Sequence, residues 1–183
     1  MNPTLPRPTD NAFLATNRYG GSKEATYAGA LSFMRRPYSR DLTDVDAVVW
    51  GIPFDSAVSN RPGARFGPQA IRRASAIFDG DPQYPFHLDP FADLAVVDYG
   101  DCSFDYGYPM EAGGHMKAQA AAILAAGPFL LTLGGDHYTT LPMLEAHFER
   151  HGPMALVQFD AHQDTWDDDG GRIDPGSFVG RAV

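Results

Sequence analysis

Cysteine, long apolar runs and positive charge are all scarce in this sequence. Cys102 is the only cysteine among 183 residues, which excludes a disulfide framework and a Cys-x-x-Cys metal pair and indicates a reducing environment. No apolar run approaches the roughly 20 residues that a membrane span needs. The polar N-terminus contains no apolar core of a secretory signal. We therefore expect a cytoplasmic protein that makes no contact with membranes.

The shortage of positive charge argues against nucleic acid as a partner. The chain has 14 Lys and Arg against 23 Asp and Glu, a formal net charge of −9, whereas phosphate binding normally needs a basic face. A cationic substrate is compatible with this charge, although most acidic proteins are simply soluble. With 44% hydrophobic and 20% charged residues, the composition is that of an ordinary globular domain.

Apolar runs alternate with helical stretches from about residue 45 onward. The runs predict strands at 45–50, 94–98, 129–133 and 154–160, and the stretches between them predict helices at 68–78, 110–126 and 141–150. Near-continuous apolar strands that alternate with helices favour an α/β fold with a parallel sheet covered on both faces. Residues 1–40 are predicted to be an N-terminal arm with one short helix over 24–36, and residues 41–183 form the regular part.

Polar side chains collect where the predicted strands end. Gly134-Gly135-Asp136-His137 follows one apolar run, and Asp160, His162 and Asp164 follow another. In an extended strand the i, i+2, i+4 spacing turns three side chains to one side, and parallel sheets bind ligands beyond the carboxyl ends of their strands. Carboxylate oxygen and imidazole nitrogen together suit a divalent cation such as manganese. The sequence therefore predicts a metal site.

Other interpretations of these residues stay open at this point. His137 could cap the following helix, and Asp136 is better placed to orient His137 than to bind metal. A single-zinc deacetylase would also use an Asp-x-His pair. With two ions, Asp160 could bridge them while Asp164 and His162 each serve one, and paired ions lower the pKa of a shared water so that it becomes a nucleophile.

In combination, the motifs resemble those of the ureohydrolases, the arginase and agmatinase family. The resemblance lies in Gly134-Gly135-Asp136-His137 and in Asp160-Ala161-His162-Gln163-Asp164-Thr165. Gly51-Ile52-Pro53-Phe54-Asp55, followed by Arg61-Pro62-Gly63-Ala64-Arg65-Phe66-Gly67-Pro68, is similar to the agmatinase branch. The resemblance implies a three-layer α/β/α, arginase-like fold, of which residues 41–183 would be the N-terminal part, and assembly into homotrimers or hexamers.

The resemblance also assigns the metal ligands of a site with two Mn²⁺ ions. His137 would bind one ion and His162 the other, while Asp160 would bridge both. Asp164 would bind the ion at His137 and hydrogen-bond the attacking hydroxide, so Asp160 and Asp164 are the expected catalytic residues. No substrate-binding residue is assigned. The loop 61–68 would lie near the mouth of the site, although a rigid Pro/Gly turn explains it equally well.

Two features depart from the family pattern. The family's Ser-x-Asp-x-Asp motif, whose aspartates complete both metal shells, does not occur in these 183 residues. The segment 173–178 matches a family segment that carries a histidine, a candidate proton shuttle, but Pro175 stands in its place. Proline has no titratable group, so it cannot transfer protons.

The expected function is manganese-dependent hydrolysis of a small cationic guanidino substrate. Agmatine, giving putrescine and urea for polyamine biosynthesis, is the first choice, and a guanidinobutyrase or another guanidino-acid hydrolase is the alternative within the class. A truncated, inactive homologue that only binds metal or pairs with subunits is the alternative of another class. Four ligands with two carboxylates leave part of the charge of two Mn²⁺ ions uncompensated, which weakens binding.

Overall fold

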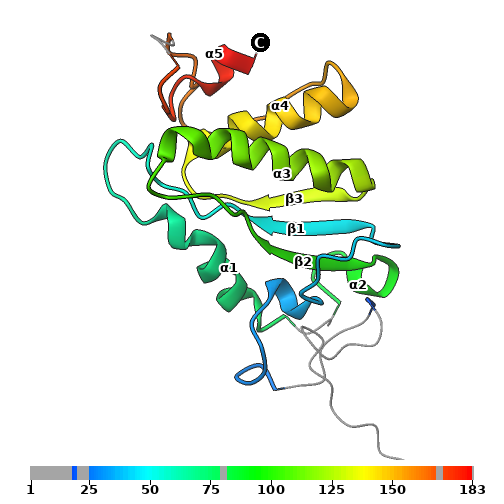
Figure 1. Cartoon of the computed structure of the whole chain (residues 1–183). Coiled ribbons are helices and arrows are strands. Elements are labelled where there is room, and N and C mark those ends of the chain that lie inside the picture. Colours follow the sequence, from blue (N-terminus) through cyan, green and yellow to red (C-terminus); the bar gives the residue numbers. More distant parts are fainter. Residues whose placement is uncertain (1–17, 20–24, 79–81, 168–170, 183) are drawn as a thin grey trace, which may run out of the picture.

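Three parallel strands form the centre of the computed structural model, which describes residues 18–19, 25–78, 82–167 and 171–182 (Figure 1). Their order in the sheet is β2-β1-β3, with β1 at Ala47–Gly51, β2 at Val96–Asp101 and β3 at Phe129–Leu133. The α-helices are α1 (Gly67–Ser75), α2 (Pro90–Asp93), α3 (Ala112–Ala126), α4 (Thr140–His151) and α5 (Phe178–Ala182). Short 3₁₀ helices are η1 (Phe33–Arg35), η2 (Ala64–Phe66), η3 (Pro109–Glu111) and η4 (His137–Thr139).

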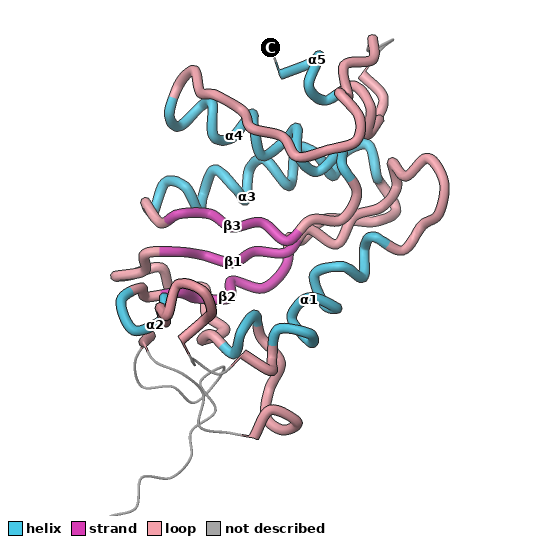
Figure 2. Tube along the Cα trace, turned by 180° about the vertical axis from the view of Figure 1, so that it is seen from behind, coloured by secondary structure: helices cyan, strands magenta, loops and turns pink. Residues whose placement is uncertain are grey.

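Helices cover both faces of this sheet (Figures 1 and 2). Val48 and Trp50 of β1 join the larger apolar core, which includes the buried residues of α3 and α4. Val49, which points the opposite way, joins a separate small core with Phe91. A Cβ on Gly51, on the same face as Val49, would lie 2.9 Å from Cβ of Pro68 in α1. The chain therefore has the expected three-layer α/β/α architecture with a parallel sheet.

The predicted strand over 154–160 is wrong, although the other strands and helices after residue 45 lie close to their predicted places. Residues 154–160 pair with no strand in the part of the chain that the structure describes. Val157 and Phe159 are 76% and 97% exposed. A strand needs a neighbour for its backbone N–H and C=O groups, so an apolar run alone does not make one. The segment instead runs as a loop past α4 (Figure 2).

The predicted helix over 24–36 is also not formed, although residue 24 lies outside the described residues. Only η1 is helical in this stretch, and Met34 and Arg35 have positive φ angles of 46° and 54°. The buried Arg35 side chain donates to the carbonyl oxygens of Ala25, Ala28 and Ala76. The carbonyl groups of Ala25 and Ala28, which would accept backbone hydrogen bonds in a helix, thus accept hydrogen bonds from the buried Arg35 side chain instead.

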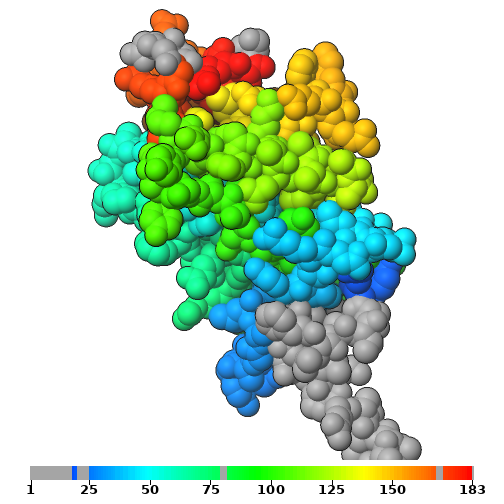
Figure 3. Space-filling view, in the orientation of Figure 1, coloured from blue at the N-terminus to red at the C-terminus, as the bar shows by residue number. Residues whose placement is uncertain are grey.

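The predicted N-terminal arm, residues 1–40, lies largely outside the described residues and stays a prediction as a unit. Its described stretch 25–40 contacts the domain closely, because the backbone N–H of Met34 donates to Oγ of Ser75 in α1. The space-filling view shows this part and α5 at opposite ends of the molecule (Figure 3). None of the described helices combines the length and apolarity that crossing a bilayer requires.

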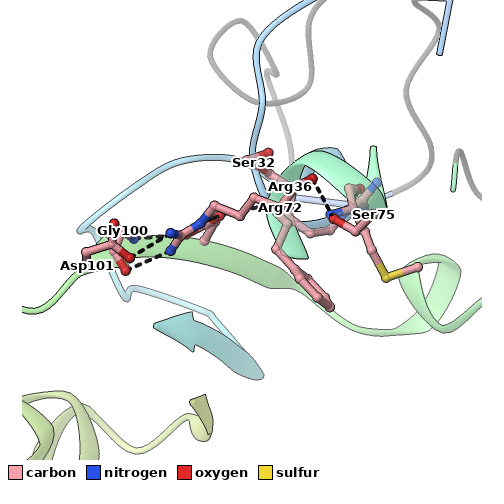
Figure 4. A network of polar contacts seen from close by, with 9 residues as sticks. Ser32, Arg36, Arg72, Ser75, Gly100 and Asp101 are labelled. Atoms are coloured by element: carbon pink, nitrogen blue, oxygen red, sulfur yellow. Dashed lines mark hydrogen bonds and ion pairs between the residues drawn. The ribbon is translucent and has the colours of Figure 1, made fainter. Parts of the chain in front are cut away.

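Arg72 joins α1 to β2 through a buried ion-pair network (Figure 4). Its guanidinium group donates to the two carboxylate oxygens of Asp98 at 2.7 and 2.9 Å, to Asp101 at 2.6 Å and to the carbonyl oxygen of Gly100 at 3.0 Å. Asp98 is fully buried and also accepts a hydrogen bond from the backbone N–H of Phe33. The network therefore fixes α1 and η1 on one face of the sheet.

Replacing Arg72 with leucine should destabilise the fold strongly, because the buried Asp98 carboxylate then has no counter-charge. We expect the free energy of unfolding to fall by about 3–5 kcal/mol, the usual cost of removing one partner of a buried ion pair. Urea denaturation measures it. The matched control is Arg73→Leu at the exposed neighbouring position, which should change the value by less than about 0.5 kcal/mol. Equal losses in the two variants would contradict this role of Arg72.

Candidate metal centre

The turn after β3 lies directly against the chain that leaves β1. A Cβ on Gly135 would lie 2.7 Å from the backbone nitrogen of Phe54 and 2.8 Å from the carbonyl oxygen of Ile52, so only glycine permits this approach. The backbone N–H of Asp136 donates to the carbonyl oxygen of Phe54 at 2.7 Å. The Gly-Gly pair of the motif thus joins two strand ends.

Asp136 organises this turn from a nearly buried position. One of its carboxylate oxygens accepts from the backbone N–H of Ala57 at 2.8 Å, and the other accepts from that of Tyr138 at 3.1 Å and so caps η4. Burial raises the pKa of the Asp136 carboxyl above its ordinary value. Because both oxygens have protein partners, Asp136 fixes the turn that presents His137 and does not itself join the metal-competent group described next.

Three of the four predicted metal ligands come together at this edge of the sheet. Nδ1 of His137 lies 3.0 Å from Oδ2 of Asp164 and 3.3 Å from Oδ2 of Asp160. One ligand atom from each residue lies within 4.8 Å of the other two. The side chains of Asp164 and Asp160 are 9% and 22% exposed. Two carboxylates and one imidazole nitrogen fit a divalent cation such as manganese.

Asp160 and Asp164 meet through a turn and not through the extended strand that the sequence predicted. The backbone N–H of His162 donates to Oδ1 of Asp160 at 2.8 Å and thereby lowers the pKa of that carboxyl. Asp164 has a φ of 50°, in the left-handed region that aspartate tolerates. The Gln158 amide donates to Oδ2 of Asp164 at 3.1 Å. Gln158 is therefore a supporting residue that the sequence analysis did not identify.

His162 lies apart from the other three predicted ligands. Its side chain is 82% exposed, and its Nδ1 is 3.5 Å from Oδ1 of Asp160. That oxygen is the one that does not face His137, so Asp160 stands between the two histidines. In the described part of the chain only His137, Asp160 and Asp164 form a metal-competent group. The role of His162 as a ligand stays a prediction.

A cavity of about 510 Å³ opens beside these side chains. It is lined by the turn 134–137, by Asp160 and Met143, and by Thr132, Thr139 and Thr140. This volume is within the range of small-molecule sites. The described lining contains carboxylates and hydroxyl groups but neither lysine nor arginine, which favours a cationic ligand.

Asp55 anchors the loop that follows β1. Its side chain is 1% exposed and accepts from the backbone N–H of Gly63 at 2.7 Å, and it also pairs with the guanidinium group of Arg65. The hydrogen bond from Arg65 holds the pKa of the Asp55 carboxyl below its usual range. Gly63 has a φ of 134°, which glycine adopts without strain. The loop 61–68 thus owes its shape to a buried carboxylate, as well as to its proline and glycine residues.

Replacing Asp55 with asparagine should destabilise the protein most at neutral pH. Because the pKa of Asp55 is lowered in the fold, its ionised form stabilises the fold above about pH 4, and this contribution is lost as the pH falls through the lowered value. We expect a difference in unfolding free energy of about 2 kcal/mol at pH 7 that shrinks toward pH 3.

Urea denaturation at several pH values measures this difference. The exposed Asp93 offers the matched control, because Asp93→Asn should have a small effect at every pH. A difference for Asp55→Asn that does not change with pH would contradict the proposed ionised pair.

Known proteins match the chain over most of its length. Residues 45–183 match the model of the arginase family. The agmatinase of Chromobacterium violaceum is 56% identical over 161 residues, which cover 87% of this chain and 50% of that protein. A hypothetical agmatinase from Burkholderia thailandensis has a TM-score of 0.92 at 48% identity and covers 95% of this chain and 55% of that chain.

A more distant solved structure shares the same architecture. Proclavaminate amidino hydrolase from Streptomyces clavuligerus has a TM-score of 0.75 at 36% identity, covering 86% of this chain and 52% of that chain. The chain thus spans about half the length of the relatives it matches. The family match extends over all three strands and the motifs that carry His137, Asp160 and Asp164. The chain therefore belongs to the arginase family.

Proposed function

We propose that this protein hydrolyses the guanidino group of agmatine, with manganese as cofactor, to give urea and putrescine. The observation that carries the proposal is the convergence of His137, Asp160 and Asp164 at the carboxyl end of β3, beside a cavity that His137 and Asp160 line. The similarity to relatives named agmatinase supports the choice of substrate. The metal-competent group of His137, Asp160 and Asp164 supports a hydrolytic role for the protein over a purely structural one.

The ligand set fits one manganese ion and part of a second position. His137 and Asp164 would hold one ion together with Oδ2 of Asp160, while Oδ1 of Asp160 and the imidazole of His162 face a neighbouring position. Bound manganese would polarise a water molecule and stabilise the negative charge that develops during hydrolysis. Two carboxylates do not neutralise two divalent ions. These four residues alone should therefore hold a second ion more weakly than the first.

The residues around the cavity have roles that follow from their charge and position. The carboxylates of Asp160 and Asp164 attract a guanidinium cation, and Asp164 is placed to accept a hydrogen bond from the attacking water and so orient it. The threonine hydroxyl groups of the lining can hydrogen-bond the nitrogen atoms of the substrate. Pro175, half-buried next to Gly176, can supply no proton, so the amine product must be protonated by another group or by solvent.

Guanidino acids form the second candidate class of substrate. The structural neighbour proclavaminate amidino hydrolase favours this class, because the name of that protein refers to an acid. The cavity argues for agmatine, since its described lining has no lysine or arginine for a substrate carboxylate. Arg65 on the nearby loop is paired with Asp55. We therefore place agmatine before the guanidino acids.

We also propose a cytoplasmic setting, which the single cysteine favours, and assembly into homotrimers or hexamers, which the family resemblance implies. Exposed apolar residues on β3 support further association. Phe129 and Leu131 are 71% and 42% exposed on a strand that has β1 as its only described neighbour. An exposed apolar strand edge of this kind is normally covered by further polypeptide, from the same protein or from a partner subunit.

Replacing Asp164 with asparagine should weaken manganese binding by about 100-fold or more, because it removes a charged ligand from the group of three. Isothermal titration of the gene product at its natural length with Mn²⁺ measures this affinity. Asp167→Asn, at an exposed neighbouring aspartate, is the control and should bind as the parent does. His162→Ala should spare the tighter ion and weaken the other. Equal affinity in the parent and in Asp164→Asn would refute this ligand set.

Agmatine should be hydrolysed faster than 4-guanidinobutyrate, by about 100-fold in kcat/KM, because the acid brings an unpaired carboxylate to a cavity without a described cation. Urea release by the manganese-loaded protein measures both rates, and Asp164→Asn provides the background. A higher kcat/KM for 4-guanidinobutyrate than for agmatine would contradict the preference for agmatine. A protein that binds manganese but releases no urea from any guanidino compound would support the inactive homologue instead.

A further inference from the structure

Phe178 of α5 packs directly against the imidazole ring of His137. The two ring centroids are 4.5 Å apart and the ring planes are inclined by 50°. Phe178 is 1% exposed, whereas the side chain of His137 is 34% exposed, so the phenyl ring is the fixed partner of this contact. We propose that Phe178 is a positioning residue that holds Nδ1 of His137 toward Asp160 and Asp164. This inference rests on the metal-binding role proposed above.

The hydrogen bonding of His137 shows why a packing partner is needed. A histidine that binds metal through one ring nitrogen normally donates from the other nitrogen to a carboxylate or carbonyl oxygen, which sets the orientation of the ring. Nδ1 of His137 faces the two carboxylates. Within the described residues, no hydrogen-bond partner is found for its Nε2. The aromatic ring of Phe178 therefore supplies the constraint that a hydrogen bond supplies elsewhere.

Backbone contacts fix Phe178 to the segment that carries the other ligands. The N–H of Val179 donates to the carbonyl oxygen of Asp164 at 3.1 Å, and the N–H of Trp166 donates to that of Gly176 at 3.0 Å. Phe178 contacts His137 through its side chain, while its neighbour Val179 contacts Asp164 through the backbone. The segment 176–179 thus connects two ligands that lie on separate parts of the chain.

Gly176 sets how closely this segment approaches the ligands. A Cβ at position 176 would lie 2.8 Å from Cε3 of Trp166, so a larger residue would require the segment or the exposed indole ring to shift. The Trp166 ring and the Asp164 carbonyl group together determine where α5 begins. Phe178, which is 1% exposed, meets the imidazole from this first turn of α5.

The variant must separate this positioning from the part that Phe178 plays in the core. Phe178 also belongs to the core cluster that contains Tyr138, Leu141 and Met143. Phe178→Leu keeps an apolar side chain there but removes the aromatic ring, whereas Phe178→Tyr keeps the ring. Phe91→Leu is the matched control, because Phe91 is 5% exposed in the separate core on the other face of the sheet.

The experiment compares these variants in the gene product at its natural length. Isothermal titration with Mn²⁺ should show a Kd about tenfold higher for Phe178→Leu, with a changed d–d absorption spectrum when Co²⁺ replaces Mn²⁺. Phe178→Tyr should stay close to the parent in both measurements. Phe91→Leu should lower the thermal midpoint while leaving the Kd and the Co²⁺ spectrum unchanged.

A metal-free measurement separates this inference from the proposed function. In the metal-free protein, NMR three-bond couplings of His137 should report one χ1 rotamer in the parent and rotamer averaging in Phe178→Leu. Unchanged couplings, or equal metal affinity in the parent and Phe178→Leu, would overturn the positioning role. Loss of metal binding or of urea release in the parent itself would instead refute the proposed function.

Discussion

The metal-competent group depends on the close approach of the turn after β3 to the chain that leaves β1. Gly135 makes this approach possible, because its missing side chain leaves room for the backbone at Ile52 and Phe54. Asp136 then uses both carboxylate oxygens to hold Ala57 and to cap η4. His137 follows in the chain, so the contacts of Asp136 place its backbone, while Phe178 of α5 packs against its ring. A shift of this turn would move the imidazole away from both carboxylates.

Asp160 and Asp164, the two carboxylates of the group, come from a segment that makes far fewer backbone hydrogen bonds to the rest of the fold. Residues 154–160 pair with no described strand, and several of their apolar side chains are exposed. Asp160 and Asp164 nevertheless reach His137, because a local turn and the return of the chain through 176–179 hold them. The site thus lies between two parts of the chain. One is the turn after β3 together with the chain that leaves β1, and the other is the loop of Asp160 and Asp164 together with the segment 176–179. Binding a cation between them would join the two parts of the chain.

Local residue patterns were enough to predict much of this arrangement. The apolar runs predicted β1, β2 and β3, and the alternation with helices predicted a parallel sheet covered on both faces. Two rules failed where they ignored the surroundings. The run 154–160 looks like a strand by composition but has no described neighbour to pair with. The stretch 24–36 looks helical, but within its described part the buried Arg35 side chain takes up backbone carbonyl groups, and the chain turns through positive φ angles.

The fold class, the family and the candidate ligands could be predicted from the sequence alone, because strand-end motifs and apolar periodicity are local properties of the chain. The tertiary structure decided which ligands meet. It places His137, Asp160 and Asp164 together and leaves His162 exposed, since a turn, unlike a strand, does not turn alternate residues to one side. Only the structure identified Asp55, Gln158 and Phe178 as supports. Their partners lie elsewhere in the fold or on the far side of a turn, where the spacing of residues along the chain carries no information.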